Sequence, residues 1–401
     1  MKAVSNDPNG LQEITPTPLS NAKAKKIHEA LVTWFESNAR PLPWRQDYPP
    51  YWVWISEIML QQTRMETVLP YFQRWISRFP TISSLAAAPL DDVLKLWEGL
   101  GYYSRARSLH KAAQIISSDF GRELPHTPEN LRKLPGIGPY TAGAIASIAF
   151  QQPEPAVDGN AARVLSRITL QTLPVAKPIA QKYLWQTAQT LVELGNPRNL
   201  TQAIMELGAT ICTPRSPNCH RCPVTSHCLA QKENKQQEIP ARKKKLQRRI
   251  VKGITLVMEH RNKVYLRQRQ AKGLWGGLWE VPWVEATEKP SINTKALLAG
   301  IISETGIESH SSSITLLGGF HHELTHFRLE MECYHLKFPD KAEVPELQPI
   351  ATKSKANNQG WWAQEEIEKL ALGRPTSKIL NLWRDAQYQT MTQHRNQNPD
   401  E

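Results

Sequence analysis

Hydrophobic residues recur with different periods in the two parts of the chain. From residue 23 to residue 208 they follow the three- and four-residue spacing of amphipathic helices, with short turns between them. The predicted helices span 23–37, 53–66, 68–77, 90–98, 104–118, 128–134, 140–150, 160–170, 177–194 and 198–208. After Gly253 the period becomes that of strands, predicted at 254–259, 264–269 and 327–333. With further helices near 293–303 and 364–371, the pattern predicts a multidomain chain, all-α and then α+β.

The composition of the remaining segments sets the expected domain boundaries. Residues 1–22 and 386–401 are polar, and we expect a disordered lead-in and a disordered tail there. The helical domain is then 23–230 and the second domain 251–385. Residues 231–250 contain a basic run, which is either a solvated linker or a strip that binds phosphates.

Charge and apolar content restrict the possible partners. The 401 residues carry a formal net charge of +12, which favours a polyanionic partner. No stretch approaches the roughly 18 apolar residues of a membrane span, so we expect no membrane association. The N-terminus shows no secretory signal, and the cysteines do not form a spread framework of disulfides. We therefore expect a protein of the bacterial cytoplasm or nucleoid.

Four of the five cysteines lie close together in the sequence. Cys212, Cys219, Cys222 and Cys228 are separated by six, two and five residues, whereas Cys333 is distant. Four thiolates in a compact loop can hold either zinc or an iron–sulfur cluster. Structural zinc usually uses two short knuckles, and only the central pair has that spacing. The loop at 212–228 thus predicts one [4Fe–4S] cluster, with zinc as the alternative.

A glycine-rich turn joins two of the predicted helices. Residues 128–150 read as helix, turn and helix, with Gly136 and Gly138 in the turn. Glycines allow backbone N–H groups to approach a phosphate, and the following helix adds its positive N-terminal end. The segment is a candidate helix-hairpin-helix, and its alternative is an ordinary tight corner between helices.

Two carboxyl groups stand in unusual positions. Asp158 lies at the start of a predicted helix, where it can act as an N-cap or as a functional group. Glu57 lies in the apolar stretch 52–60, and a carboxyl in such a helix is either paired or functional. Desolvation would raise its pKa, as a general acid near neutral pH requires.

Together these motifs carry a family resemblance. The hairpin, the downstream aspartate and the cysteine loop resemble the endonuclease III superfamily of helix-hairpin-helix DNA glycosylases. Within it, residues 56–63 and 157–160 resemble the adenine DNA glycosylase family. The resemblance covers 23–230 and implies two helical lobes with a flipped base between them. It also implies a monomer that acts on duplex DNA containing adenine opposite 8-oxoguanine or guanine.

The resemblance implies catalytic roles for four residues. Glu57 matches the acid that protonates adenine, and Asp158 the carboxylate that stabilises the oxocarbenium-like sugar. Tyr140 and Asn160 match residues that line the same pocket. Superfamily members that cut the strand carry lysine where this chain has Tyr140, which cannot form a Schiff base. The resemblance therefore implies a monofunctional glycosylase.

Further residues match positions that contact DNA. Arg45 matches a residue near the base, Gln62 the wedge that fills the gap left by the flipped base, and Tyr102 a residue that stacks beside the lesion. Gly136 and Gly138 match the phosphate-binding hairpin.

The second domain resembles a Nudix fold at 277–282 and 303–307. The pyrophosphatase signature expects Arg-Glu followed by Glu-Glu, and the chain has Ala299, Gly300, Ser303 and Glu304 instead. This domain should bind and not hydrolyse.

The recognition loop of the second domain also departs from the family. The family loop reads Phe-Ser-His, and here it reads Leu324-Thr325-His326. Thr325 and His326 keep the polar groups that can contact the lesion, but the aromatic residue is lost.

Two other functions remain open. One is another glycosylase of the superfamily, acting on mismatched thymine or oxidised pyrimidine, against which the Nudix-like domain and Glu57 argue. The other is a DNA-binding or redox-sensing protein without catalysis, against which the presence of Glu57 and Asp158 argues.

Overall fold

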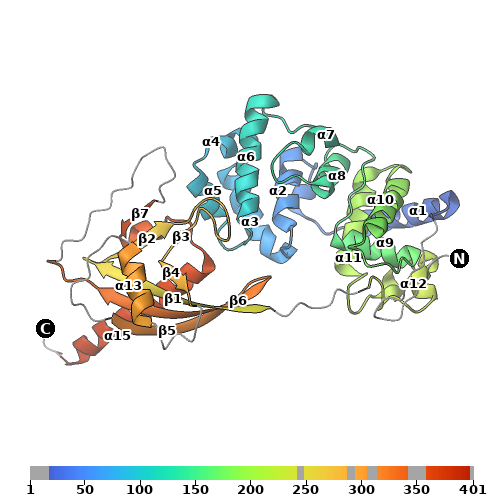
Figure 1. Ribbon diagram of the computed structural model, residues 1–401. Helices are drawn as coiled ribbons and strands as arrows, with labels where there is room; N and C mark the ends of the chain where they lie inside the picture. Colours follow the sequence, from blue (N-terminus) through green and yellow to red (C-terminus); the bar gives the residue numbers. More distant parts are fainter. Residues whose placement is uncertain (1–17, 242–247, 287–293, 305–313, 342–357, 398–401) are drawn as a thin grey trace. The chain divides into compact units, whose positions relative to one another are not determined.

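The computed structural model describes residues 18–241, 248–286, 294–304, 314–341 and 358–397 (Figure 1). The chain forms two compact units. The first combines Met1–Ala87 with Ser108–Lys245, and the second combines Ala88–Arg107 with Leu246–Glu401. The division confirms an all-α part followed by an α+β part. Among the described helices, none has the length and apolar character needed to cross a membrane.

The first unit is helical, as its hydrophobic period predicts. Its helices are α1 (Asn21–Asn38), α2 (Pro50–Leu60), α3 (Met65–Arg78), α4 (Ile82–Ala87), α6 (Ser104–Asp119), α7 (Pro128–Leu131), α8 (Pro139–Ile148), α9 (Gly159–Thr169), α10 (Pro178–Val192), α11 (Pro197–Thr210) and α12 (Leu229–Lys232). Proline occupies the first position of α2, α7, α8, α10 and α11, where its missing N–H costs no hydrogen bond. Helix α4 was not predicted, because six residues are too few to show a period.

The helices of this unit gather into two groups (Figure 1). Helices α1, α9, α10 and α11 surround a core of buried aliphatic side chains, including Leu31, Leu165, Leu184 and Leu207. A smaller cluster lies between α2 and α8, around Val53 and Ala144. The start of α9 and one side of α11 lie between the groups, where the candidate site is found.

The second unit contains a seven-stranded mixed sheet. Its strands are β1 (Arg249–His260), β2 (Lys263–Gln268), β3 (Trp279–Glu280), β4 (Trp283–Glu285), β5 (Ile314–Glu323), β6 (Phe327–Lys337) and β7 (Gln359–Trp362). The order is β3-β2-β1-β6-β5, with β4 paired to β1 and β7 to β2. Strands β1 and β6 are parallel, and the other pairs are antiparallel.

The predicted hairpin and alternating strand are both confirmed. Glu259 pairs with Val264 across a two-residue turn in which Arg261 and Asn262 have φ of 48° and 59°. Two left-handed residues give the turn whose twist matches that of paired strands. In β6, Leu329, Met331 and Cys333 are buried, as the period of two predicts.

Two long helices pack on the sheet. Helix α13 (Thr294–Glu304) packs Leu298, Ile301 and Ile302 against β1, and α15 (Arg374–Gln397) covers the other face with Ile379 and Trp383. The second unit also has the short helices α5 (Leu90–Leu96) and α14 (Gln364–Ile367).

The structure corrects two of the expected boundaries. Helix α15 continues to Gln397, so the expected disordered tail is wrong for 386–397. This end of the helix has few apolar residues, and so no period revealed it. Residues 88–107, predicted within the helical domain, group with the second unit, where Lys95 and Tyr103 donate to the Leu370 and Leu372 carbonyls at 2.9 and 3.2 Å. Most of the expected lead-in, residues 1–17, and the linker residues 242–247 lie outside the described part.

Candidate active site

A cavity of about 670 Å³ opens in the helical unit. It lies where α2, α8, the start of α9 and α11 meet. Six of the predicted site residues line it, from segments far apart in the sequence: Arg45, Glu57, Gln62, Tyr140, Asp158 and Asn160. The structure therefore brings together the expected catalytic residues and two of the expected DNA contacts.

Glu57 is the buried acid of this cavity. It is 7% exposed, and it accepts a hydrogen bond from the Tyr140 hydroxyl at 2.8 Å. The pKa of Glu57 is raised to about 7, chiefly by burial; the hydrogen bond from Tyr140 and the charge of Arg45 oppose the rise, and the Asp158 carboxylate adds to it. A substantial fraction of Glu57 thus holds a proton at neutral pH, which is the state a general acid needs.

Asp158 caps a helix and also lines the cavity. Its Oδ1 accepts a hydrogen bond from the Ala161 N–H at 2.6 Å, as an N-cap does. The positive end of α9 favours a negative charge at this place. The two interpretations of Asp158 are therefore compatible, because the cap fixes a carboxylate at the wall of the cavity.

Arg45 is held by residues that the sequence analysis did not identify. It lies at the end of the short 3-10 helix Pro43–Arg45, and its guanidinium donates to Gln202 and Glu206 at 2.9 Å each. A third bond reaches the Arg40 carbonyl at 3.0 Å. Gln202 and Glu206 are polar residues on the buried side of α11. A polar side chain on an apolar helix face is also the signal that identified Glu57, and it could have identified these two residues.

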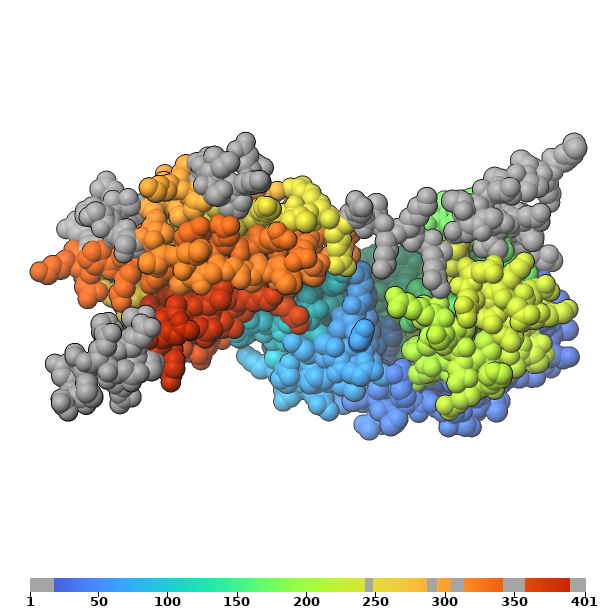
Figure 2. Space-filling model, turned by 90° about the horizontal axis from the view of Figure 1, so that it is seen from below, coloured from blue at the N-terminus to red at the C-terminus, as the bar shows by residue number. Residues whose placement is uncertain are grey.

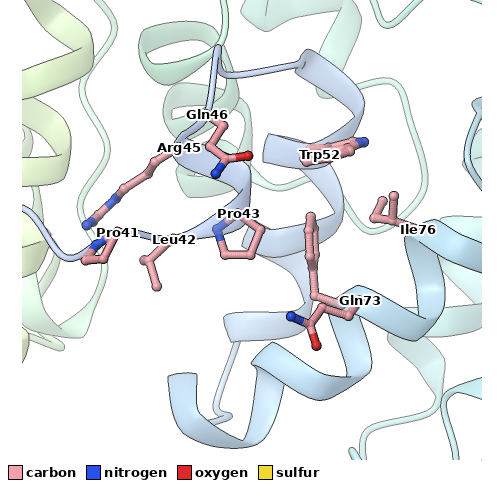
Figure 3. Close-up of a pocket in the computed structure, with 9 residues that line it drawn as sticks. Pro41, Leu42, Pro43, Arg45, Gln46, Trp52, Gln73 and Ile76 are labelled. Carbon is pink, nitrogen blue, oxygen red and sulfur yellow. The ribbon is translucent and has the colours of Figure 1, made fainter.

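A second hollow, of about 500 Å³, adjoins the first and shares Leu42 and Arg45 with it (Figure 3). Figure 3 shows the Arg45 side chain directed away from Trp52 and Ile76. Its lining residues include no carboxyl group. The acid–base groups are therefore those of the larger cavity.

The hairpin between α7 and α8 has the predicted form. Gly136 has φ of 80°, and a Cβ there would lie 2.7 Å from the Ser108 Cβ. Gly138 has an ordinary extended backbone and open space around it, and it caps α8. Gly136 therefore requires the left-handed backbone that glycine allows, whereas Gly138 does not, and its lack of a side chain leaves the N-terminus of α8 open.

The four clustered cysteines follow α11 and are electrostatic neighbours of one another. The pKa of Cys222 is raised to about 12, chiefly by burial, and the neighbouring Cys212, Cys228 and Cys219 contribute to the rise. Arg167, only 2% exposed, donates to Cys212 Sγ at 3.2 Å. Several partly buried thiols that raise one another's pKa are the donor set that a cationic iron–sulfur core would stabilise.

The cluster loop is part of the surrounding core. Val224 of the loop packs with Ala24 and Ile27 of α1, and Figure 2 shows the yellow-green loop beside the blue N-terminal helix. Arg163 also connects the loop to the cavity, since it donates to Asn160 Oδ1 at 2.9 Å and to the Cys212 carbonyl at 2.8 Å.

The remaining predicted residues lie in the second unit. Tyr102 has φ of 48° and is 44% exposed, and its hydroxyl lies 2.7 Å from Thr325 Oγ1. His326 is exposed in the turn between β5 and β6. Leu324, in place of the family's aromatic residue, packs against the core beneath that turn. Within this unit, residues 88–107 thus bring Tyr102 beside the loop Leu324-Thr325-His326.

Comparisons with known proteins match each part of the chain. The family model of HhH-GPD superfamily base excision DNA repair proteins matches residues 55–189, and that of the iron–sulfur binding domain of endonuclease III matches residues 212–228. The NUDIX domain model matches residues 253–382. Among solved structures, a thermostable thymine-DNA glycosylase is 27% identical, covering 53% of this chain and 98% of its own, with a TM-score of 0.47.

Curated relatives extend over most of the chain. Human adenine DNA glycosylase is 33% identical over 420 residues, which cover 91% of this chain and 75% of the human protein. The adenine DNA glycosylase of Buchnera aphidicola subsp. Schizaphis graminum is also 33% identical, covering 89% of this chain and 98% of its own.

The helical fold, its cluster loop and these matches define a DNA glycosylase of base excision repair, an enzyme that hydrolyses N-glycosyl bonds in DNA. A [4Fe–4S] cluster is its cofactor. Within this class, the chain belongs to the adenine DNA glycosylase family.

Proposed function

We propose that this enzyme removes adenine paired with 8-oxoguanine, and more slowly adenine paired with guanine, by hydrolysis and without cutting the strand. The observation that carries the proposal is the buried acid Glu57, whose pKa is raised to about 7 and which lines the same cavity as the Asp158 carboxylate. Cleavage of a glycosidic bond requires an acid for the leaving base and an anion for the sugar.

The geometry supports a role for each residue. Glu57 donates its proton to a ring nitrogen of the flipped adenine, so that the base can leave with the electron pair of the bond to C1′. Positive charge then develops on the sugar, and the Asp158 carboxylate stabilises it. A water molecule adds to C1′ and gives its proton to the Glu57 carboxylate, which restores the acid. Tyr140 holds Glu57 in place through the 2.8 Å hydrogen bond.

The lack of a lysine supports a monofunctional reaction. In the strand-cutting members of the superfamily, an amine attacks the sugar carbon and forms a Schiff base. Tyr140 occupies that place here, with its hydroxyl bound to Glu57 and its pKa raised well above the ordinary value by burial. A neutral phenol cannot carry out this step.

Base release from defined duplexes tests the proposal. We expect single-turnover release of adenine to be fastest opposite 8-oxoguanine, slower opposite guanine, and minimal for thymine opposite guanine. The strand should remain intact until alkali is added. Glu57→Gln should bind the duplex and lose nearly all release, because the amide keeps the shape and cannot donate this proton. Glu66→Gln, an exposed carboxyl at the rim of the same cavity, is the matched control. Full activity of Glu57→Gln would show that the acid lies elsewhere.

A further inference from the structure

A third carboxyl group of the cavity has no role in the reaction as described. Glu206 is on α11 and only 3% exposed, yet it lines the cavity. Its Oε1 is paired with Arg40 Nε, and its Oε2 accepts hydrogen bonds from Arg40 Nη2 at 3.0 Å and Arg45 Nη2 at 2.9 Å. These pairs hold the pKa of Glu206 below its usual value, in spite of burial. The buried Glu206 carboxylate therefore forms ion pairs with both Arg40 and Arg45.

The two cations differ in their exposure. The Arg45 side chain is 11% exposed and that of Arg40 is 35% exposed. Arg45 is further fixed by Gln202 and by the Arg40 carbonyl, and its guanidinium lies 5.0 Å from the centre of the Phe35 ring. Because each of the three guanidinium nitrogens donates a hydrogen bond, its charge stays at one place in the cavity wall.

The charge of Arg45 acts on the general acid. Glu57 lines the same cavity as Arg45, Asp158 at the start of α9 and Tyr140 of α8, and Arg45 lowers its pKa. Arg40 and Glu206 complete this wall. The first turn of α3 adds the rim residues Arg64 and Glu66. An unpaired cation at the position of Arg45 would stabilise the ionised form of Glu57 and lower its pKa. A cation paired with a carboxylate lowers that pKa much less.

We propose that Glu206 is a positioning residue for glycosidic cleavage: it fixes and neutralises Arg45 and Arg40, so that Glu57 keeps its proton near neutral pH. The inference rests on the proposed function, in which Glu57 is the general acid. It assigns Glu206 no contact with the substrate.

The pH profile of single-turnover base release tests this role in the full-length protein. In Glu206→Gln the shape is kept and one negative charge is lost. The fall in rate on the alkaline side should then move to lower pH by about one unit. The rate at pH 8 should drop about sevenfold more than the rate at pH 5.5. Glu206→Asp keeps the negative charge. The fall in rate on the alkaline side of the pH profile, the alkaline limb, should then stay at the wild-type pH. Glu193→Gln, an exposed carboxyl on the same unit, should change neither rate nor limb.

Two further variants test the same role if Glu206→Gln folds poorly. Arg40→Gln removes the more exposed cation, so the alkaline limb should move to higher pH. Adding Arg45→Gln to Glu206→Gln removes one charge of each sign, and the limb should return toward the wild-type position whatever the absolute rate.

The outcomes separate this inference from the proposed function. A Glu206→Gln enzyme whose rate falls by the same factor at every pH would overturn the positioning role, and so would an unmoved limb in Arg40→Gln. Failure of the proposed function would look different: the wild-type enzyme would lack the alkaline limb, or Glu57→Gln would remain active.

Discussion

At the scale of single residues, Glu57 illustrates a conflict between activity and stability. The same burial that keeps it protonated at neutral pH makes its ionised form costly. Its neighbours do not remove this cost: Asp158 adds to it, and the lowering effects of Tyr140 and Arg45 still leave the pKa at about 7. A buried acid of this kind should therefore weaken the fold.

We expect Glu57→Gln to be more stable than the wild type at pH 8. The pKa of Glu57 is raised from 4.5 to about 7 on folding, so the folded protein keeps a proton that the unfolded chain loses. Below pH 4.5 both states are protonated and no penalty exists. The penalty grows between pH 4.5 and 7 and is complete above that, up to about 3 kcal/mol. Urea unfolding of both proteins at pH 5 and pH 8 measures it. A stability difference that does not grow with pH would contradict the raised pKa.

The two hairpin glycines make a matched pair for a second prediction. Gly136→Ala should lower the free energy of unfolding by roughly 1–3 kcal/mol, because of its positive φ and the contact with Ser108. Gly138→Ala should leave stability within about 0.5 kcal/mol, since its backbone is ordinary and the space is open. Thermal unfolding compares the two. Equal destabilisation by both substitutions would show that the turn has another conformation.

At the scale of elements, the cysteine loop belongs to the core built by α1, α9, α10 and α11. Val224 is buried in that core, and Cys212 and Cys222 pack against it. The sequence predicted the ligand set, but the loop's place beside α1 follows from packing. Losing the cluster should therefore loosen these helices and not only the loop.

Cys222→Ala should yield protein with far less iron than the wild type, which we expect to hold about four irons and four sulfides per chain. Its melting temperature should also fall, because the core beside the loop loses its support. Cys333→Ala is the matched control: Cys333 is buried in β6, far along the chain, and its loss should leave the iron content unchanged. Iron and sulfide analysis of the anaerobically purified proteins measures whether only Cys222→Ala loses iron. Equal iron loss in both variants would contradict the assignment.

At the scale of the whole molecule, the residues proposed for catalysis and for recognition lie in different units. Glu57 and Asp158 lie in the first unit, whereas Tyr102, Thr325 and His326 lie in the second. Adenine is a normal base, so a specific enzyme has to test the opposite base before cleavage. We propose that the second unit does this.

The double substitution Thr325→Ala, His326→Ala should lower the ratio of activity on adenine opposite 8-oxoguanine to that opposite guanine by about tenfold. A hydrogen-bond partner left unpaired costs roughly 1–3 kcal/mol, and the lesion offers such partners where guanine does not. The full chain is the right subject, because residues 88–107 belong to the second unit by their contacts. Exposed Glu365→Ala and Glu368→Ala serve as controls in the same unit. If both mispairs lost activity by the same factor, the unit would add affinity without discrimination.

The sequence by itself determined the elements and the chemistry that is local along the chain. Helical and strand periods gave the order of the elements, because burial of one face imposes the period. The cysteine spacing gave the cluster site, and the carboxyl in an apolar stretch gave Glu57. The tertiary structure alone decided which distant segments meet: Glu206 with Arg45, Arg167 with Cys212, and residues 88–107 with the second unit. It also separated Gly136, which needs a left-handed backbone, from Gly138, which does not. A residue's partners and its backbone angles depend on packing across the fold, and the local pattern of residues does not specify them.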